Sequence, residues 1–225
     1  MRFQSEKLEQ LAPLSDEEVV GRVLAGDTGA FELLMRRHNQ RLFRTARSVL
    51  SNDTDAMDAL QEAYIRVYKG LSAFEKRSTL ATWMTRIVFN ESIRFRSRRA
   101  RVSRRERLGV QQAAAESQTQ LPESGMDGTE RMQRFDEAMD ALTENERGVV
   151  MLRVIHGLST RETALSLGLS ESNVKVSLFR AKPKLAAVLG GDGVGSVRQS
   201  LTFDGERCDR LVRSVFIGIE QVHEA

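Results

Sequence analysis

The sequence predicts an all-α protein of two small helical domains joined by a flexible linker. Apolar residues recur at helical spacing in both halves of the chain, which favours amphipathic helices over strands. Large apolar residues almost disappear between the halves. Three positions carry Ser or Thr followed three residues later by Glu, the capping box that begins a helix: Ser15 with Glu18, Thr143 with Glu146, and Ser159 with Glu162.

The first half should contain a loose arm, residues 1–13, followed by four helices. The first helix is expected to begin after Ser15 and to stop at Gly26. Asp27 is placed to cap the second helix, whose apolar stripe extends to a turn at residues 51–53. Both helices therefore have one face to bury and belong to one domain.

The third predicted helix, residues 54–69, carries carboxylates in its early turns. Asp55, Asp58 and Glu62 lie toward the N-terminal end, where negative charge interacts favourably with the helix dipole. Local stabilisation of roughly a few tenths of a kcal/mol each would explain these carboxylates without any partner.

A loop and an arginine-rich helix complete the first half. In the loop, residues 71–77, Phe74 stands close to two cations. Ser78 is placed to cap the fourth helix, which contains the only tryptophan, Trp83. Residues 86–107 hold nine arginines against two glutamates, too large an imbalance for a solvated face of alternating ion pairs. The pattern is typical of a polyanion-binding surface, with a basic helix end that has no partner as the alternative.

The middle of the chain divides it into domains. Residues 108–130 are rich in Gln, Ala, Glu, Ser, Gly and Thr and cannot bury enough apolar surface to offset their ordering entropy. We therefore expect a first domain at 14–107, a flexible linker at 108–130, a second domain at 131–189 and a C-terminal extension at 190–225.

The second domain ends in two short helices joined by a tight turn. Gly168 is expected to end the first of them and Ser170 to cap the second. The second helix sorts its residues onto an apolar stripe of Val174, Leu178, Ala181 and Leu185 and a polar face of Asn173, Ser177, Arg180 and Lys184. Asn and Arg can pair with base edges while Lys and Ser hold phosphates, so the pattern predicts a DNA-reading helix-turn-helix. An ordinary helical hairpin with a solvated face is the alternative.

The residue inventory argues against catalysis, a metal site or a membrane span. Three histidines, His38, His156 and His223, have no Cys or His neighbour at metal-ligand spacing. Cys208, the only cysteine, has no recognisable base partner and suits a reducing compartment. No run of about 18 apolar residues is present, and the first residues lack the apolar segment of a signal peptide. We expect a cytoplasmic protein that is not an enzyme, with no catalytic residues, no cofactor, no metal and no membrane insertion.

Two sets of motifs resemble a known family. Residues 55–64, Phe74 and residues 78–90 are similar to region 2 of extracytoplasmic-function (group 4, sigma-70 family) RNA polymerase sigma factors. Region 4 of the same family is similar to the motifs at 142–147, 157–159, 162–164, 167–170, 173–175 and 180–181. The resemblance covers about residues 15–105 and 131–188, in the order that the family has.

The resemblance implies a factor for transcription initiation, often in a stress response, that directs core RNA polymerase to promoter DNA and helps to open it. An anti-sigma factor is a further candidate partner. By position, it implies polymerase docking for Asp55, Asp58, Leu60, Gln61 and Glu62; recognition of the minus-10 element for Phe74, Glu75, Lys76, Arg77, Ser78, Trp83, Asn90 and Arg94; and recognition of the minus-35 element for Ser172, Asn173, Lys175, Val176, Ser177, Phe179 and Arg180.

The chain departs from the family pattern at three positions. Met57 stands where an acid is common, and Ser177 stands where arginine is frequent. Pro183 lacks an N–H and predicts a bend or an end of the recognition helix, which puts Lys184 in doubt as a DNA contact.

The C-terminal extension is less regular than the two domains. Residues 203–209 resemble an extension seen in some family members. Residues 203–219 are expected to form a short helix capped by Asp204, with Leu211, Val215 and Ile219 on one side.

Two other functions would use parts of the same pattern. A free-standing helix-turn-helix regulator would bind duplex DNA without polymerase, normally as a dimer on a palindrome. Such a regulator has no use for the acidic helix and arginine-rich helix of the first domain. A protein that sequesters another sigma factor would not need the DNA-facing side of the second helix.

Overall fold

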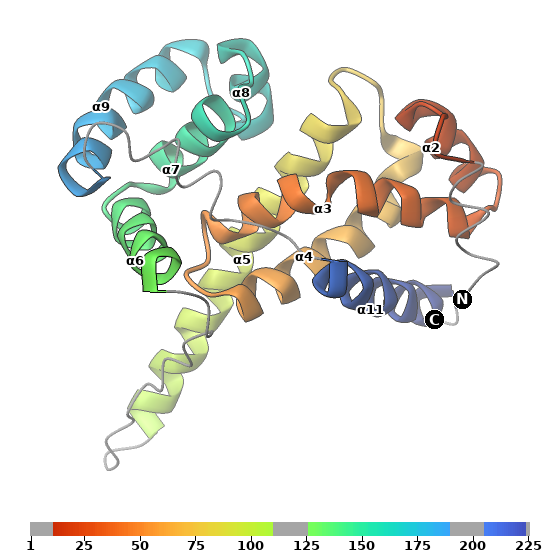
Figure 1. Cartoon of the computed structure of the whole chain (residues 1–225), viewed down its shortest axis with the longest axis horizontal. Helices are drawn as coiled ribbons and strands as arrows, with labels where there is room; N and C mark the ends of the chain where they lie inside the picture. The colour runs from red at the N-terminus through yellow and green to blue at the C-terminus, as the bar shows by residue number, and fades with distance from the viewer. Residues whose placement is uncertain (1–10, 110–125, 190–204, 224–225) are drawn as a thin grey trace.

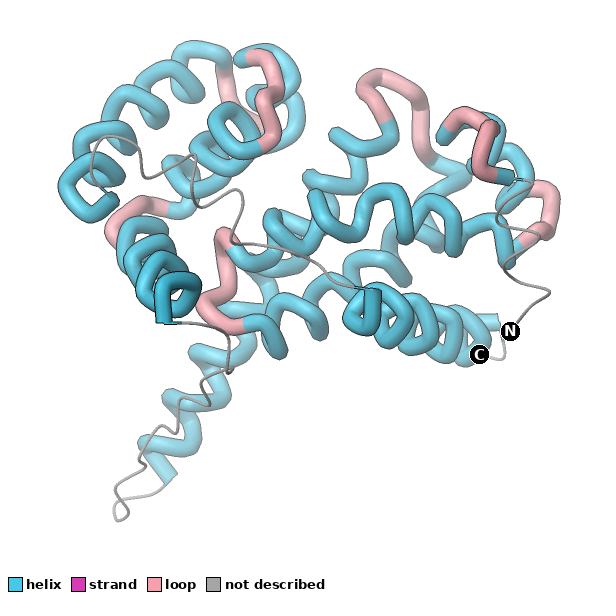
Figure 2. Tube along the Cα trace, viewed as in Figure 1, coloured by secondary structure: helices cyan, strands magenta, loops and turns pink. Residues whose placement is uncertain are grey.

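The computed structural model describes residues 11–109, 126–189 and 205–223, and these form helices, turns and loops without a strand (Figure 2). The predicted all-α fold class is confirmed for the described residues. The α-helices are α2 (Asp16–Leu24), α3 (Phe31–Arg47), α4 (Asp53–Gly70), α5 (Leu80–Gly109), α6 (Met126–Asp140), α7 (Glu144–Val150), α8 (Thr160–Leu167), α9 (Glu171–Leu189) and α11 (Gly205–His223) (Figure 1).

The predicted helix starts are confirmed where side chains cap them. In each of three capping boxes, the hydroxyl of Ser15, Thr143 or Ser159 accepts a backbone N–H, and the glutamate three residues later accepts the N–H of the cap. The Ser170 hydroxyl accepts the N–H of Asn173 at 3.1 Å. Both helices of the helix-turn-helix therefore begin where the sequence predicts.

Two predicted caps were wrong. Asp27 makes no capping hydrogen bond, and a short 3-10 turn, Thr28–Ala30, precedes α3 instead. The cap of α5 is Thr79, whose hydroxyl accepts the N–H of Thr82 at 3.2 Å. Ser78 lies one residue before this position, and its hydroxyl donates to the carbonyl of Thr79 at 3.4 Å instead.

Segments expected to lack structure contribute to the fold. Leu11, in the predicted loose arm, is buried in the core of the first domain. Helix α5 extends to Gly109 and α6 begins at Met126, so both ends of the predicted linker at 108–130 are helical. Extending an existing helix by a few residues costs little compared with nucleating one. Parts of these predictions lie outside the described residues: residues 110–125 of the linker, residues 1–10 of the arm, and the cap Asp204.

The first domain, α2 to α5, is built around one apolar core. Tyr64 of α4 is completely buried and meets Phe31 of α3 edge-on, with ring centroids 6.1 Å apart. Leu60 and Met84 are also fully buried in this core. The C-terminal part of α5 extends away from the rest of the fold in Figure 1.

The second domain, α6 to α9, buries the predicted apolar stripe of the recognition helix. Ala181 and Leu185 of α9 pack with Phe135 of α6. Val174, nearer the start of α9, packs with Ala164 of α8. The two contacts hold α9 against the rest of the domain with its other side outward.

Helix α9 continues through Pro183 to Leu189, so of the two expected outcomes, a bend or an end at this proline, the end is contradicted. A proline inside a helix costs about 3 kcal/mol. Past it, Leu185 is buried and Val188 packs on the same core, and burying one such side chain contributes about 1.5–3 kcal/mol. Tertiary packing therefore outweighs the local cost of the proline.

The two domains pack against each other. Thr45 Oγ1 of α3 and His156 Nε2 of the second domain lie 2.9 Å apart. Helix α7 lies so close to α5 that a Cβ added at Gly148 would be 2.6 Å from Cζ of Phe89. This contact requires the glycine because the neighbour is a buried aromatic ring.

Arg47 forms the central ion pairs of the contact between the domains. Its guanidinium is buried and donates a hydrogen bond to the carbonyl of Leu50. It also lies 2.8 Å from the carboxylate of Asp53 and 3.2 Å from that of Asp136 in α6. Burial raises the pKa of Asp136 to about 6, although Arg47 acts in the opposite direction. Desolvation thus exceeds ion pairing for this carboxyl.

We expect the Asp136→Asn variant to remove a pH dependence of stability. Because the pKa of Asp136 is raised in the folded chain, its contribution to stability is complete below about pH 4 and is lost as pH rises through about 6. Relative to the variant, wild type should lose roughly 1–2 kcal/mol of unfolding free energy over this range, allowing for partial exposure of the group. Urea unfolding followed by Trp83 fluorescence measures this.

The matched control is Glu137→Gln, an exposed neighbour on the same helix. It should follow the wild-type pH profile. Parallel profiles for wild type and Asp136→Asn would contradict the assignment.

Candidate nucleic-acid and polymerase interfaces

The predicted docking residues on α4 do not all face outward. Asp58 is exposed on the surface of α4. The limited loss of water around its carboxylate, and then the nearby charge of Glu62, raise its pKa. Leu60 is fully buried, so it supports the helix from the core and offers no surface. Gln61 is half-buried and donates a hydrogen bond to the carbonyl of Ser214 in α11 at 3.3 Å.

The remaining docking carboxylates on α4 pair with the arginines of α5. Asp55 is bound by Arg99, and Glu62 lies 2.6 Å from Arg98. These two pairs hold α4 against α5. They also neutralise part of the arginine excess that the sequence assigned to a polyanion-binding surface. Asp58 is the predicted docking carboxylate that stays exposed.

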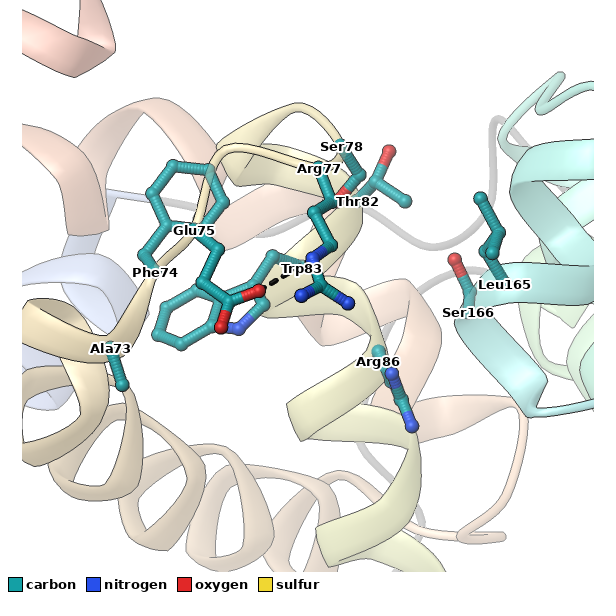
Figure 3. Close-up of a pocket in the computed structure, with 10 residues that line it drawn as sticks. All are labelled: Ala73, Phe74, Glu75, Arg77, Ser78, Thr82, Trp83, Arg86, Leu165 and Ser166. Atoms are coloured by element: carbon teal, nitrogen blue, oxygen red, sulfur yellow. Dashed lines mark ion pairs between the residues drawn. The ribbon is translucent and has the colours of Figure 1, made fainter.

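A pocket of about 270 Å³ lies where the loop before α5 meets the start of that helix (Figure 3). Phe74 and Trp83 form its aromatic wall, with ring centroids 5.2 Å apart. Arg77 reaches across it and pairs with Glu75 at 2.5 Å. The full lining is Ala73, Phe74, Glu75, Arg77, Ser78, Thr82, Trp83, Arg86, Leu165 and Ser166.

The structure brings most of the predicted minus-10 residues to this pocket or next to it. Lys76 stands outside the lining, with its ammonium 2.6 Å from Glu17 of α2 and a backbone φ of 55°. A positive φ is uncommon for a residue with a side chain. It turns the loop so that Glu75 and Arg77, on either side, both line the pocket.

Helix α5 extends the pocket into a longer face. Trp83, Asn90 and Arg94 recur at spacings that place them on one side of an α-helix. Asn90 and Arg94 are exposed. Nη1 of Arg94 lies 3.5 Å from the buried carboxylate of Glu91, and the Arg94 side chain is still 61% exposed.

Three lining residues of the first domain were not predicted from the sequence: Ala73, Thr82 and Arg86. Arg86 is exposed. It follows Trp83 by three residues and precedes Asn90 by four, so it shares their side of the helix. That spacing was available as a signal, but Arg86 was counted only within the arginine-rich segment. Thr82 is buried at the pocket wall and had no sequence signal of its own.

The pocket also has a wall from the second domain. Leu165 and Ser166 of α8 face it across the domain contact (Figure 3). Leu165 is 53% exposed although it is large and apolar. Nothing in the sequence indicated that α8 would lie beside the loop before α5, because this depends on how the two domains pack.

The outward side of α9 carries the predicted minus-35 residues. Phe179 is 79% exposed and Val176 is 46% exposed, although both are apolar. Ser177 is only partly exposed. The predicted minus-35 residues that are exposed are Ser172, Asn173, Lys175, Val176, Phe179 and Arg180.

Lys184 does not belong to the outward polar face on which the sequence placed it. Its ammonium lies 2.7 Å from Glu146 of α7. Burial acts to raise the pKa of Glu146, but hydrogen bonds from Lys184 and from the backbone of Thr143 outweigh it and lower the pKa. Lys184 therefore fastens α9 to the start of α7, beyond the proline.

The described parts of the chain contain no candidate membrane span and no candidate metal site. None of the helices there combines the length and apolar character needed to cross a bilayer. Within the same residues, no three His, Cys, Asp or Glu side chains are gathered in a way that could hold a metal ion.

Comparison with known proteins identifies both domains. Sigma-70 region 2 matches residues 34–102, and sigma-70 region 4 matches residues 132–185. The chain is 32% identical over 176 residues to the ECF RNA polymerase sigma factor SigM of Mycobacterium tuberculosis, covering 78% of this chain and 85% of SigM. It is 30% identical over 176 residues to the ECF RNA polymerase sigma-E factor of Escherichia coli, covering 75% and 91%.

Solved structures agree with these relatives. CnrH, solved in complex with the cytosolic domain of CnrY, is 27% identical with a TM-score of 0.57, covering 77% of this chain and 96% of CnrH. RpoE of Bartonella quintana, solved with the anti-sigma factor NepR, has a TM-score of 0.53 over 67% of this chain and 91% of RpoE; at 23% identity it supports the fold alone. With both regions in order and a relative at 32% identity that is covered almost throughout, the chain belongs to the ECF family of RNA polymerase sigma factors.

Proposed function

We propose that this sigma factor, which directs RNA polymerase to promoters, divides its work among three surfaces. The exposed carboxylate of Asp58 on α4 docks on core polymerase. The pocket between Phe74 and Trp83 takes an unpaired base of the minus-10 element. The outward side of α9 reads the minus-35 element. The three surfaces lie in the proposed domains, 14–107 and 131–189, with no catalytic act by the chain itself.

The pocket is the single observation that carries this proposal most strongly. An unpaired base is held by stacking on aromatic rings and by contacts to its edge. Phe74 and Trp83 supply the rings, and Arg77 and Ser78 supply donors at the rim. Beyond the pocket, Asn90 and Arg94 continue along α5, where a displaced strand would pass.

The recognition helix suits duplex DNA chemically. Asn173 and Arg180 can pair with base edges, and Lys175 can bind phosphate. The exposed ring of Phe179 has no use in a solvated helix, but it can contact a thymine methyl group in the major groove. This gives the most exposed apolar side chain of α9 a role.

The packing of the domains affects when the pocket can work. Leu165 and Ser166 of α8 line one side of it, so a base entering from that side requires the second domain to move away. We infer that the described arrangement belongs to the free chain and that binding to polymerase and promoter separates α8 from the pocket.

A free-standing regulator is not favoured, because the pocket and α4 would then have no function. An anti-sigma factor is a further proposed partner. RpoE of Bartonella quintana was solved with an anti-sigma factor, and this chain has the same fold.

The first prediction from this proposed function is that Asp58→Lys lowers the affinity for core RNA polymerase at least about tenfold. A carboxylate docks on a positively charged surface, so a lysine at this position should repel the same surface. Asp58 is chosen over Glu62 because Glu62 pairs with Arg98 and helps to hold α5. Core binding is measured by fluorescence anisotropy at fixed salt.

Glu137→Lys is the matched control, since it makes the same charge change at an exposed site on α6. It should leave core binding within about twofold. Equal affinities for Asp58→Lys and wild type, with unchanged circular dichroism, would remove the docking assignment.

A second prediction separates DNA opening from DNA binding. Phe74→Ala and Arg86→Ala should leave formation of the closed complex nearly intact and reduce the permanganate-reactive open complex about tenfold or more, because the pocket is needed only after the strands part. Both signals are measured on one promoter fragment with core polymerase. Equal loss of the two signals would assign these residues to folding.

A third prediction compares two cations of α9. Arg180→Ala should weaken binding of the holoenzyme to a minus-35 duplex by about 1–3 kcal/mol, as for loss of a base or phosphate contact. Lys184→Ala should change DNA affinity less than about twofold, because this side chain is bound to Glu146. A titration across a salt series measures both, and a large loss for Lys184→Ala would contradict the placement of Lys184.

A further inference from the structure

Helix α11, in the C-terminal extension, lies along α3 and α4 of the first domain (Figure 1). Leu211, Val215 and Ile219, predicted to share one side of a helix, are buried in the same core as the side chains of α4, together with Val212. The extension therefore forms an additional helix of the first domain, although it follows the second domain in sequence.

The contacts of α11 follow α4 along its length. Near the start of α4, Asp53 pairs with Arg207 at 2.6 Å. Two turns later, Gln61 donates to the carbonyl of Ser214. A further turn on, Ile65 packs directly on the backbone of α11, where a Cβ at Gly218 would lie 2.5 Å from its Cδ1.

These contacts occupy part of the surface proposed for polymerase. Gln61, one of the proposed docking residues, is engaged by α11, whereas Asp58, one turn before it, is exposed. Packed helices lie about 8–10 Å apart, and each is about 10–12 Å wide with its side chains. A partner helix that packed on Gln61 and Asp58 together would overlap α11.

The attachment of α11 to α3 is polar. Arg36 pairs with Asp209 at 2.8 Å, and the Nδ2 amide of Asn39 donates to the thiol of Cys208 at 3.0 Å. The Arg36 pair is largely exposed, and exposed pairs contribute little to stability. Burial of apolar side chains against α4 is thus the main interaction that keeps α11 in place. A partner that covers the same apolar surface of α4 can displace α11.

We propose that α11 is an internal competitor of core RNA polymerase for the side of α4 that contains Gln61 and Ile65. The proposal rests on the proposed docking of α4. In the free chain α11 covers this side, and its tether keeps it at a high effective concentration. Core polymerase binds after α11 has left, with the exposed Asp58 as its first contact.

The test locks α11 in place in the full chain. Ile65→Cys and Gly218→Cys, combined with Cys208→Ser, place two thiols at neighbouring positions, because the Cβ at 218 would lie 3.3 Å from Cγ1 of Ile65. The oxidised, cross-linked form should bind core polymerase at least about tenfold more weakly than its reduced form. The control is the Ile65→Cys, Cys208→Ser chain under the same oxidation, which should not change.

A second variant loosens α11 without truncation. Gly218→Gln adds a side chain where α11 meets Ile65 and should raise the affinity for core polymerase about threefold or more. Ile217→Gln changes the adjacent residue, which is 57% exposed, and is the matched control with unchanged affinity. Circular dichroism on each chain checks that the fold persists.

The outcomes separate this proposal from the docking assignment. Equal binding of the oxidised and reduced forms, with weakened binding of Asp58→Lys, overturns the role of α11 and leaves docking on α4 intact. Unchanged binding in both experiments overturns the docking assignment and the competitor role with it. Weaker binding of Gly218→Gln would mean that α11 is part of the docking surface, which also overturns the proposal.

Discussion

A buried hydrogen-bond chain centred on Tyr64 fixes how the helices of the first domain meet. The Tyr64 hydroxyl, fully enclosed, donates to Oδ1 of Asn39 at 2.7 Å, and Nδ2 of Asn39 donates to Sγ of Cys208 at 3.0 Å. Burial raises the pKa of Tyr64 well above its usual range. Because buried polar groups are costly without partners, this chain sets α4 and α3 in one register and adds one contact to α11 in the free chain.

That register decides which sides of α4 are available. With Tyr64 and Leu60 inward, Asp55 and Glu62 turn to the arginines of α5, Gln61 turns to α11, and Asp58 is exposed. The same core positions α5 through Met84, next to Trp83, so that the tryptophan both packs on the core and lines the pocket. Folding and function thus share this side chain.

Local chemistry was predictable from the sequence, whereas long-range packing was not. Capping boxes such as Ser159 with Glu162 depend on residues three apart, so the helix starts could be read directly. The continuation of α9 past Pro183 depends on its burial against α6, and the pairing of Lys184 with Glu146 joins residues 38 apart. The family resemblance grouped Phe74 and Trp83 as minus-10 residues, but the sequence could not show that α8 would form the other wall of the pocket that they line.

Two surfaces of the free chain are covered, and the coverings differ in kind. At the pocket, α8 contributes Leu165 and Ser166, and Leu165 is still half exposed. On α4, α11 contributes several completely buried aliphatic side chains to the core. Free energy of burial scales with the apolar area removed from water, so α11 is held on α4 mainly by burial, whereas moving α8 from the pocket also breaks the domain contact at Phe89 and Arg47. A partner that displaces α11 must therefore supply apolar contacts of its own, as well as charge complementary to Asp58.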